Sequence, residues 1–128
     1  MENLRVAKLL PYAYEALKND TVINKDGKGI IEKSLRGQIS SFGASILTGS
    51  LEASVAFYSV QGRAKSPRDA LLPVICKILR DGGEFAAPDE SKTDLKEIVF
   101  TSKDPELSEK IIDASIAIKL AMNFFELK

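Results

Sequence analysis

The segment that most constrains the fold is residues 36–59, RGQISSFGASILTGSLEASVAFYS. Its pattern predicts two apolar helices joined by a corner at Thr48-Gly49-Ser50. Gly49 suits the left-handed residue that often ends a helix, and the Ser50 hydroxyl can cap the helix that follows. The rest of the chain also shows mainly helical patterns, so we expect an all-α fold.

Three segments share features with one known family. The corner Gly49-Ser50-Leu51 joins a helix rich in small residues to an apolar helix that ends in Ala56-Phe57. Residues 12–17, YAYEAL, resemble the family's first helix, and residues 114–127, ASIAIKLAMNFFEL, resemble its long final helix. In these features the chain resembles the small helical subunit of the type III-B CRISPR effector, the RNA-guided Cmr complex.

The chain departs from this family at three places. A serine, Ser50, intervenes in the family's Gly-Leu pair at the corner. The final helix lacks the expected tryptophan, and Phe124 and Phe125 occupy that region. Residues 82–103 match nothing in the family.

Length and composition indicate one domain, residues 1–128, that is long enough to bury a core. No apolar run reaches membrane-spanning length and no segment resembles a signal peptide, so we expect a cytoplasmic protein without membrane contact. The single cysteine, Cys76, lies in the apolar run VICKI. A buried core thiol is the simpler interpretation of Cys76, and a nucleophile is the alternative.

The chain contains no histidine, which removes the commonest general base and metal ligand. Carboxylate clusters at Asp89-Glu90 and at Glu106, Glu109 and Asp113 have ordinary explanations, as a loop and as acids near a helix start. The run DGKG at 26–29 lacks the spacing of a phosphate loop and predicts a turn. We therefore expect no catalysis, no metal site and no cofactor.

Helical periodicity predicts a compact bundle of five or six helices with a long C-terminal helix. The helices are expected over approximately residues 3–18, 30–48, 51–60, 67–80 and 104–127. Prolines at 11 and 73 should bend or restart their helices, and the third helix should be buried. Residues 82–103 form an exposed linker region with a short helix around 93–100, or a strand at 97–101 as the alternative.

Two helices carry more than one distinctive face. The second has a core stripe of Ile31, Leu35, Gln38/Ile39, Phe42 and Ile46, and an opposite face of Lys33, Arg36, Gly37, Ser40 and Ala44. Glycine inside a helix is unfavourable unless something must approach closely. We expect packing to explain Gly43, and we leave Gly37 open between packing and an interface. The last helix has two apolar stripes, so it is either central in the bundle or covered by a partner.

The resemblance implies a non-catalytic structural subunit that stacks in several copies along an antiviral ribonucleoprotein. Its expected partners are other effector subunits, further copies of itself, guide RNA and target RNA. Residues 1–80 carry a net charge of +5 and residues 81–128 a net charge of −5, a pattern that suits a basic surface for RNA. The candidate RNA-binding residues are Lys33, Arg36, Arg63, Lys65 and Arg68. The alternatives are the small subunit of a type III-A effector and a helical protein-binding adaptor.

Overall fold

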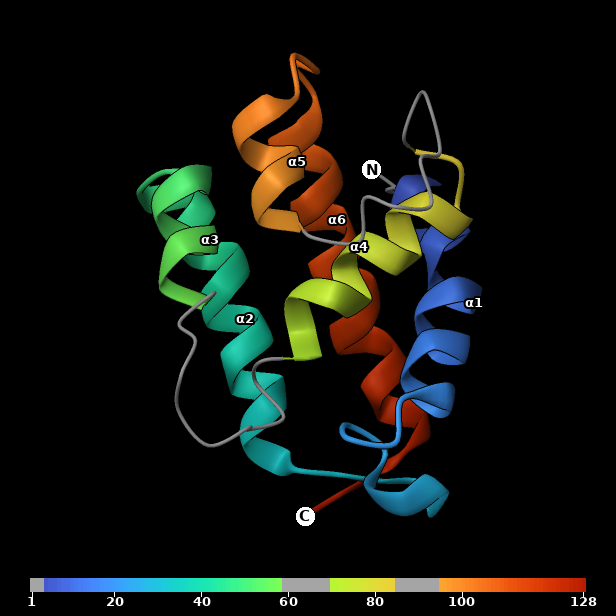
Figure 1. The fold of residues 1–128 in the computed structure, drawn as a ribbon. Helices are drawn as coiled ribbons and strands as arrows, with labels where there is room; N and C mark the ends of the chain where they lie inside the picture. Colours follow the sequence, from blue (N-terminus) through green and yellow to red (C-terminus); the bar gives the residue numbers. More distant parts are fainter. Residues whose placement is uncertain (1–3, 59–69, 85–94) are drawn as a thin grey trace.

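The computed structural model describes residues 4–58, 70–84 and 95–128, and these ranges contain six α-helices (Figure 1). The helices are α1 (Leu4–Asn19), α2 (Lys33–Thr48), α3 (Leu51–Tyr58), α4 (Leu71–Asp81), α5 (Leu95–Thr101) and α6 (Leu107–Ala121). Single 3₁₀ turns are η1 (Lys25–Gly27) and η3 (Met122–Phe124), and two short strands are β1 (Ile30–Ile31) and β2 (Glu126–Leu127). The predicted all-α bundle is confirmed.

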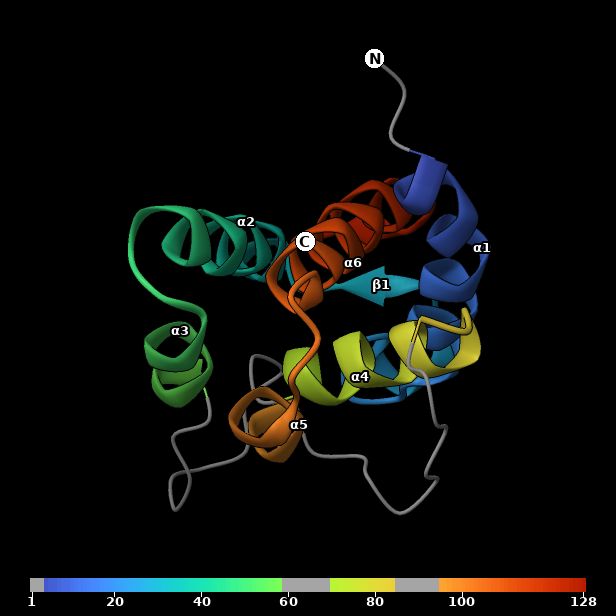
Figure 2. The ribbon, with the colours of Figure 1, turned by 90° about the horizontal axis from the view of Figure 1, so that it is seen from above.

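Helix α6 is the centre of this bundle. It packs against α1, α2 and α4, which surround it on three sides (Figure 2). Helix α3 packs on α2 and on α5, at the edge of the molecule. The predicted long C-terminal helix is therefore the element that the others bury.

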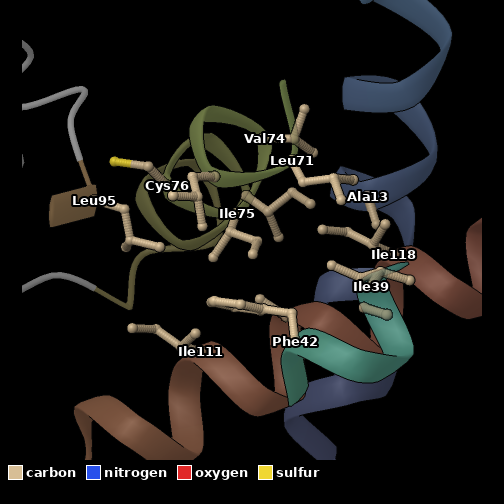
Figure 3. Close-up of a cluster of buried hydrophobic side chains, with 14 of the residues drawn as sticks. Ala13, Ile39, Phe42, Leu71, Val74, Ile75, Cys76, Leu95, Ile111 and Ile118 are labelled. Atoms are coloured by element: carbon tan, nitrogen blue, oxygen red, sulfur yellow. The ribbon is translucent and has the colours of Figure 1, made fainter. Parts of the chain in front are cut away.

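The core forms where the predicted helical stripes meet. The α2 stripe of Leu35, Ile39, Phe42 and Ile46 is buried, and the face of α4 toward α6 is equally apolar. Figure 3 shows side chains from several helices converging on one cluster around Phe42, Ile75 and Ile118. Cys76 is buried beside them with 1% of its surface exposed, as predicted for a core thiol.

The second and last helices are shorter than predicted because their ends form a small sheet. Residues 30–31 and 126–127 pair as parallel strands, in the register Ile30 to Glu126. The amide of Glu126 donates to the carbonyl of Gly29 at 2.9 Å, and the amide of Lys128 donates to the carbonyl of Ile31 at 3.0 Å. The prediction of helix at both segments was wrong, since this pairing satisfies their backbone groups across the chain.

The corner between α2 and α3 confirms one prediction and corrects another. The Ser50 hydroxyl accepts a hydrogen bond from the amide of Ala53 at 3.0 Å, which is the predicted cap. Gly49 is not left-handed, since its φ is −124°. Its amide bonds the carbonyl of Ser45, and a Cβ at Gly49 would lie 3.1 Å from that oxygen. Close backbone approach, rather than positive φ, therefore favours glycine here.

Helices α3 and α5 settle two further predictions. Helix α3 buries Leu51, Val55 and Tyr58, but Phe57 on its outer face is 62% exposed. The prediction of a fully buried third helix was wrong because α3 lies at the edge of the bundle. The segment 95–101 is helix rather than the alternative strand.

The two prolines cause no break. Helix α1 is one helix through Pro11, and both Pro11 and Ala7 are exposed, so water can solvate the Ala7 carbonyl that loses its donor. Pro73 is the third residue of α4, where a backbone amide has no partner within the helix. Gly82 and Gly83 follow the end of α4, as predicted.

An ion cluster joins the start of α1 to the end of α4 and the start of α6. The Arg5 guanidinium lies 2.9 Å from the Asp113 carboxylate and 3.5 Å from that of Glu84, and Lys8 also pairs with Glu84. Burial opposes the charge of Arg5, but its hydrogen bond to Asp113 and the nearby carboxylates outweigh burial and raise its pKa. Glu84 was predicted to lie in an exposed linker, and its half-buried position in this cluster corrects that prediction.

Candidate nucleic-acid interface

The outward side of α2 carries two of the predicted RNA-binding residues. Lys33 is exposed and Arg36 is half-buried, and they lie in the first two turns of the helix. The side chains that follow on this side are small as far as Ala44, and Gly37, Ser41 and Ala44 are all exposed. Leu47, which is 73% exposed, lies one turn further along the same side. The face is therefore flat only between its two cations and Leu47.

The two glycines of α2 have different environments. A Cβ added to Gly43 would lie 3.9 Å from the Cβ of Ser115, so Gly43 faces α6 inside the bundle. A Cβ added to Gly37 would have no neighbouring atom within 4 Å. Gly43 therefore faces the bundle, as predicted, but 3.9 Å is an ordinary van der Waals distance, so packing does not require glycine there. Gly37 has open space around it among the residues that the structure describes.

The packing of α2 on α6 adds a cation that the sequence did not single out. The two helices are antiparallel, since Gly43 faces Ser115 while the Lys33 amide donates to the carbonyl of Lys128 at 3.3 Å. Arg36 lies two turns before Gly43, and Lys119 lies one turn after Ser115. Arg36 and Lys119 therefore border the same seam between the helices, about one turn apart along it. Lys119 could be recognised as a cation at this seam only from the antiparallel packing of α2 and α6, because the spacing of residues along the sequence does not show that packing.

These three cations have no ion-pair partner among the described residues, as is also true of Lys18, Lys25, Lys28 and Lys103. Among the residues that the structure describes, no carboxylate lies within 4.0 Å of Lys33, Arg36 or Lys119. By contrast, Lys77 and Arg80 both pair with Asp81, at 3.6 and 3.8 Å. The positive charge of the α2–α6 seam is thus available to an external anion.

The remaining predicted RNA-binding residues, Arg63, Lys65 and Arg68, lie outside the described residues and stay predictions. So does the Asp89-Glu90 pair. In the other carboxylate cluster, Glu106 and Asp113 bind Arg5. The structure thereby gives these two acids a role in joining α1 to α6.

We name the surface formed by Lys33, Arg36, Gly37, Ser40, Ala44 and Lys119 the α2–α6 basic face. A phosphate backbone can approach it closely, because small residues surround the cations and positive charge without a partner attracts phosphate. Within the described ranges, no three acidic or cysteine side chains lie close enough to hold a metal ion. No helix in these ranges is long and apolar enough to cross a bilayer.

Comparison of the chain with protein-family models, with curated proteins and with solved structures gave no match.

Proposed function

We propose that this protein is a non-catalytic structural subunit of a type III-B CRISPR ribonucleoprotein effector, where it contacts guide or target RNA through its α2–α6 basic face. The observation that carries the proposal is that Lys33, Arg36 and Lys119 lie around the small residues Gly37, Ser40 and Ala44, and no carboxylate among the described residues lies within 4.0 Å of these three cations. Nonspecific RNA contact needs only cations on a rigid surface that the phosphate backbone can reach.

The helical corner and the final helix, which resemble the Cmr small subunit, support the choice of assembly. In the structure, α2 and α3 are joined at Gly49 and Ser50, the corner on which the resemblance rests. The absence of histidine from the chain favours a structural role over general acid–base catalysis. In this proposal other subunits perform cleavage, and copies of this chain line the RNA.

The proposal predicts weak RNA binding by the isolated chain that depends strongly on salt. We expect the triple variant Lys33→Ala, Arg36→Ala and Lys119→Ala to bind single-stranded RNA less tightly. Removing three phosphate contacts should lower the slope of log affinity against log salt concentration by about 2. Fluorescence anisotropy with a labelled oligonucleotide at several salt concentrations measures both quantities.

A matched control removes three other cations. The variant Lys8→Ala, Lys77→Ala and Lys103→Ala has the same net charge, and two of its lysines pair with carboxylates in the structure. It should keep most of the RNA affinity. Equal losses in the two triple variants would show that total charge, rather than the α2–α6 basic face, governs binding.

The choice of assembly needs a separate experiment in the native host. The tagged protein should co-purify with other effector subunits and with a ladder of guide RNA. Purification of the same bait carrying the α2–α6 substitutions should retain the protein partners and lose target RNA. Recovery of protein partners without any RNA from the unaltered bait would instead support the helical adaptor.

A further inference from the structure

Helix α6 leaves one of its two apolar stripes uncovered. Ile116, Leu120 and Phe124 recur every four residues, and 41%, 42% and 68% of their surfaces are exposed. The opposite stripe of Ile111, Ala114 and Ile118 is fully buried in the core. The bundle therefore uses one stripe of α6 and presents the other to the outside.

Helix α1 extends this apolar surface on one side. Phe124 packs edge-on against Tyr14, with ring centroids 5.7 Å apart, and Leu10 is half-buried one turn earlier on α1. Helices α1 and α6 are parallel, because Arg5 at the start of α1 bonds Asp113 in the middle of α6, while Tyr14, further along α1, meets Phe124 just beyond the end of α6. We call the continuous surface of Leu10, Tyr14, Ile116, Leu120 and Phe124 the α1–α6 strip. None of these five side chains carries a charge.

We propose that the α1–α6 strip binds the same strip of a second copy, with the two α6 helices antiparallel across a two-fold axis. A two-fold contact places identical surfaces against each other, so a charged strip would repel itself. An uncharged apolar strip has no such repulsion and removes apolar surface from water on both copies.

Charges at the ends of the strip favour this antiparallel arrangement. Glu109 is exposed at the start of α6, and Lys18 is exposed near the end of α1. No ion pair of either residue is present among the described residues. When two antiparallel α6 helices cross midway between Ile116 and Leu120, Glu109 lies nine residues before the crossing, level with a point about 9 Å beyond the end of the second α6 at Ala121.

That level is also the position of Lys18, because α1 runs alongside α6 in parallel. The dimer would thus contain the Glu109–Lys18 pair twice. The antiparallel arrangement also brings the positive N-terminal ends of α1 and α6 toward the negative C-terminal ends of the second copy. A second copy therefore matches the strip in both apolarity and charge.

This dimer goes beyond the proposed function and does not depend on it. A two-fold contact closes after two copies, whereas stacking along RNA requires a contact that propagates. The strip shares no residue with the α2–α6 basic face, but Lys119 lies beside Leu120 at its edge, so RNA binding is compared here with variants of Lys33 and Arg36 alone. Self-association and RNA binding can therefore be measured, and can fail, separately.

Sedimentation equilibrium of the full chain, from about 10 μM to about 1 mM, tests the proposal. The strip is small compared with standard interfaces, so we expect a dimer dissociation constant on the order of 100 μM. Leu120→Glu, and independently Phe124→Glu, should weaken the dimer at least about tenfold because each places a carboxylate in the apolar contact. Phe100→Glu is the matched control, since Phe100 is 59% exposed on α5, away from the strip.

Charge exchange tests the predicted register. Glu109→Lys should weaken the dimer about fivefold, because two ion pairs become two repulsions. The double variant Glu109→Lys with Lys18→Glu should recover the original affinity. A chain that is monomeric at 1 mM would overturn the proposal, and so would equal effects of the Leu120 and Phe100 variants. Dimerisation without charge rescue would overturn the antiparallel register.

Discussion

At the scale of single residues, the two glycines of α2 lie in different environments. Gly43 faces Ser115 of α6, and an added methyl group would make an ordinary contact with Ser115 at 3.9 Å, whereas a larger side chain would meet α6. Gly37 has open space around it among the described residues. Because an exposed glycine in a helix interior destabilises the helix, we expect Gly37 to face a molecule outside the bundle.

Leucine substitutions distinguish these two glycines. Gly37→Leu should stabilise the isolated chain by about 0.5–1 kcal/mol, through helix propensity. Gly43→Leu should destabilise it by about 1–3 kcal/mol, because the side chain would have to displace α6. Urea denaturation followed by circular dichroism measures both changes. Destabilisation by Gly37→Leu would contradict an open face at this position.

If RNA meets the α2–α6 basic face, Gly37→Leu should also lower RNA affinity while the chain remains folded. The bulky side chain would hold the phosphate backbone away from Arg36 and Lys119. Gly37→Ala provides the control, since a methyl group raises helix propensity with little bulk. Equal RNA affinity of both variants would place the phosphate contact elsewhere.

At the scale of secondary-structure elements, the small sheet fixes the path of the chain between α1 and α2. Its loop is organised by Asn24, which is 3% exposed. The Asn24 side chain accepts a bond from the amide of Gly29 at 2.6 Å and donates to the carbonyl of Lys18 at 2.9 Å. Strand β2 then holds β1 against the end of α6. The start of α2, with Lys33, is positioned by this arrangement.

Proline at position 128 tests the contribution of the sheet. Lys128→Pro removes the amide that bonds the Ile31 carbonyl, so it should lower the free energy of unfolding by about 1 kcal/mol. Lys128→Ala keeps the amide and removes only an exposed side chain, and its effect should stay within about 0.5 kcal/mol. Thermal denaturation of the two variants gives the difference. Equal stabilities would show that the Lys128–Ile31 bond contributes little.

At the scale of the whole molecule, the opposite charges of the two halves of the chain are brought together. Arg5 and Lys8 from the basic half pair with Glu84, Glu106 and Asp113 from the acidic half. This cluster lies where α1 and α6 begin and α4 ends. Two cations of the basic half and three acids of the acidic half are therefore paired at one end of the bundle, away from Lys33 and Arg36.

Acid titration tests the neighbouring Asp104–Lys110 pair. The hydrogen bond from Lys110, at 2.7 Å, and the bond from the Glu106 amide lower the pKa of Asp104 below its ordinary value of 3.8. A carboxyl whose pKa is lowered by folding contributes stability above its unfolded pKa and loses it as pH falls through the folded value.

The variant Asp104→Asn should therefore be less stable than the parent at pH 7, and the difference should shrink as pH falls below about 4. Urea midpoints of both proteins between pH 7 and pH 2 provide the comparison. A difference that stays constant across this range would show that ionisation of Asp104 does not contribute to stability.

Local spacing was sufficient to predict most of the helices and their buried faces. The stripe of Leu35, Ile39, Phe42 and Ile46 is buried as predicted, because a helix repeats every 3.6 residues and its apolar side must face the core. The Ser50 cap was also predictable, since its hydroxyl bonds an amide only three residues away. Lys33 and Arg36 were found by their position opposite that buried stripe.

Contacts between distant segments determined the rest. Ile30 and Ile31 form a strand because residues 126–127 lie beside them, and a local pattern cannot show that pairing. Lys119 borders Arg36 only because α2 and α6 are antiparallel. The two stripes of α6 are equally apolar in sequence, and packing buried one and exposed the other. In each case, whether a residue pairs with another segment or is buried depends on which segment of the chain packs against it. The residue's own side chain does not determine this alone.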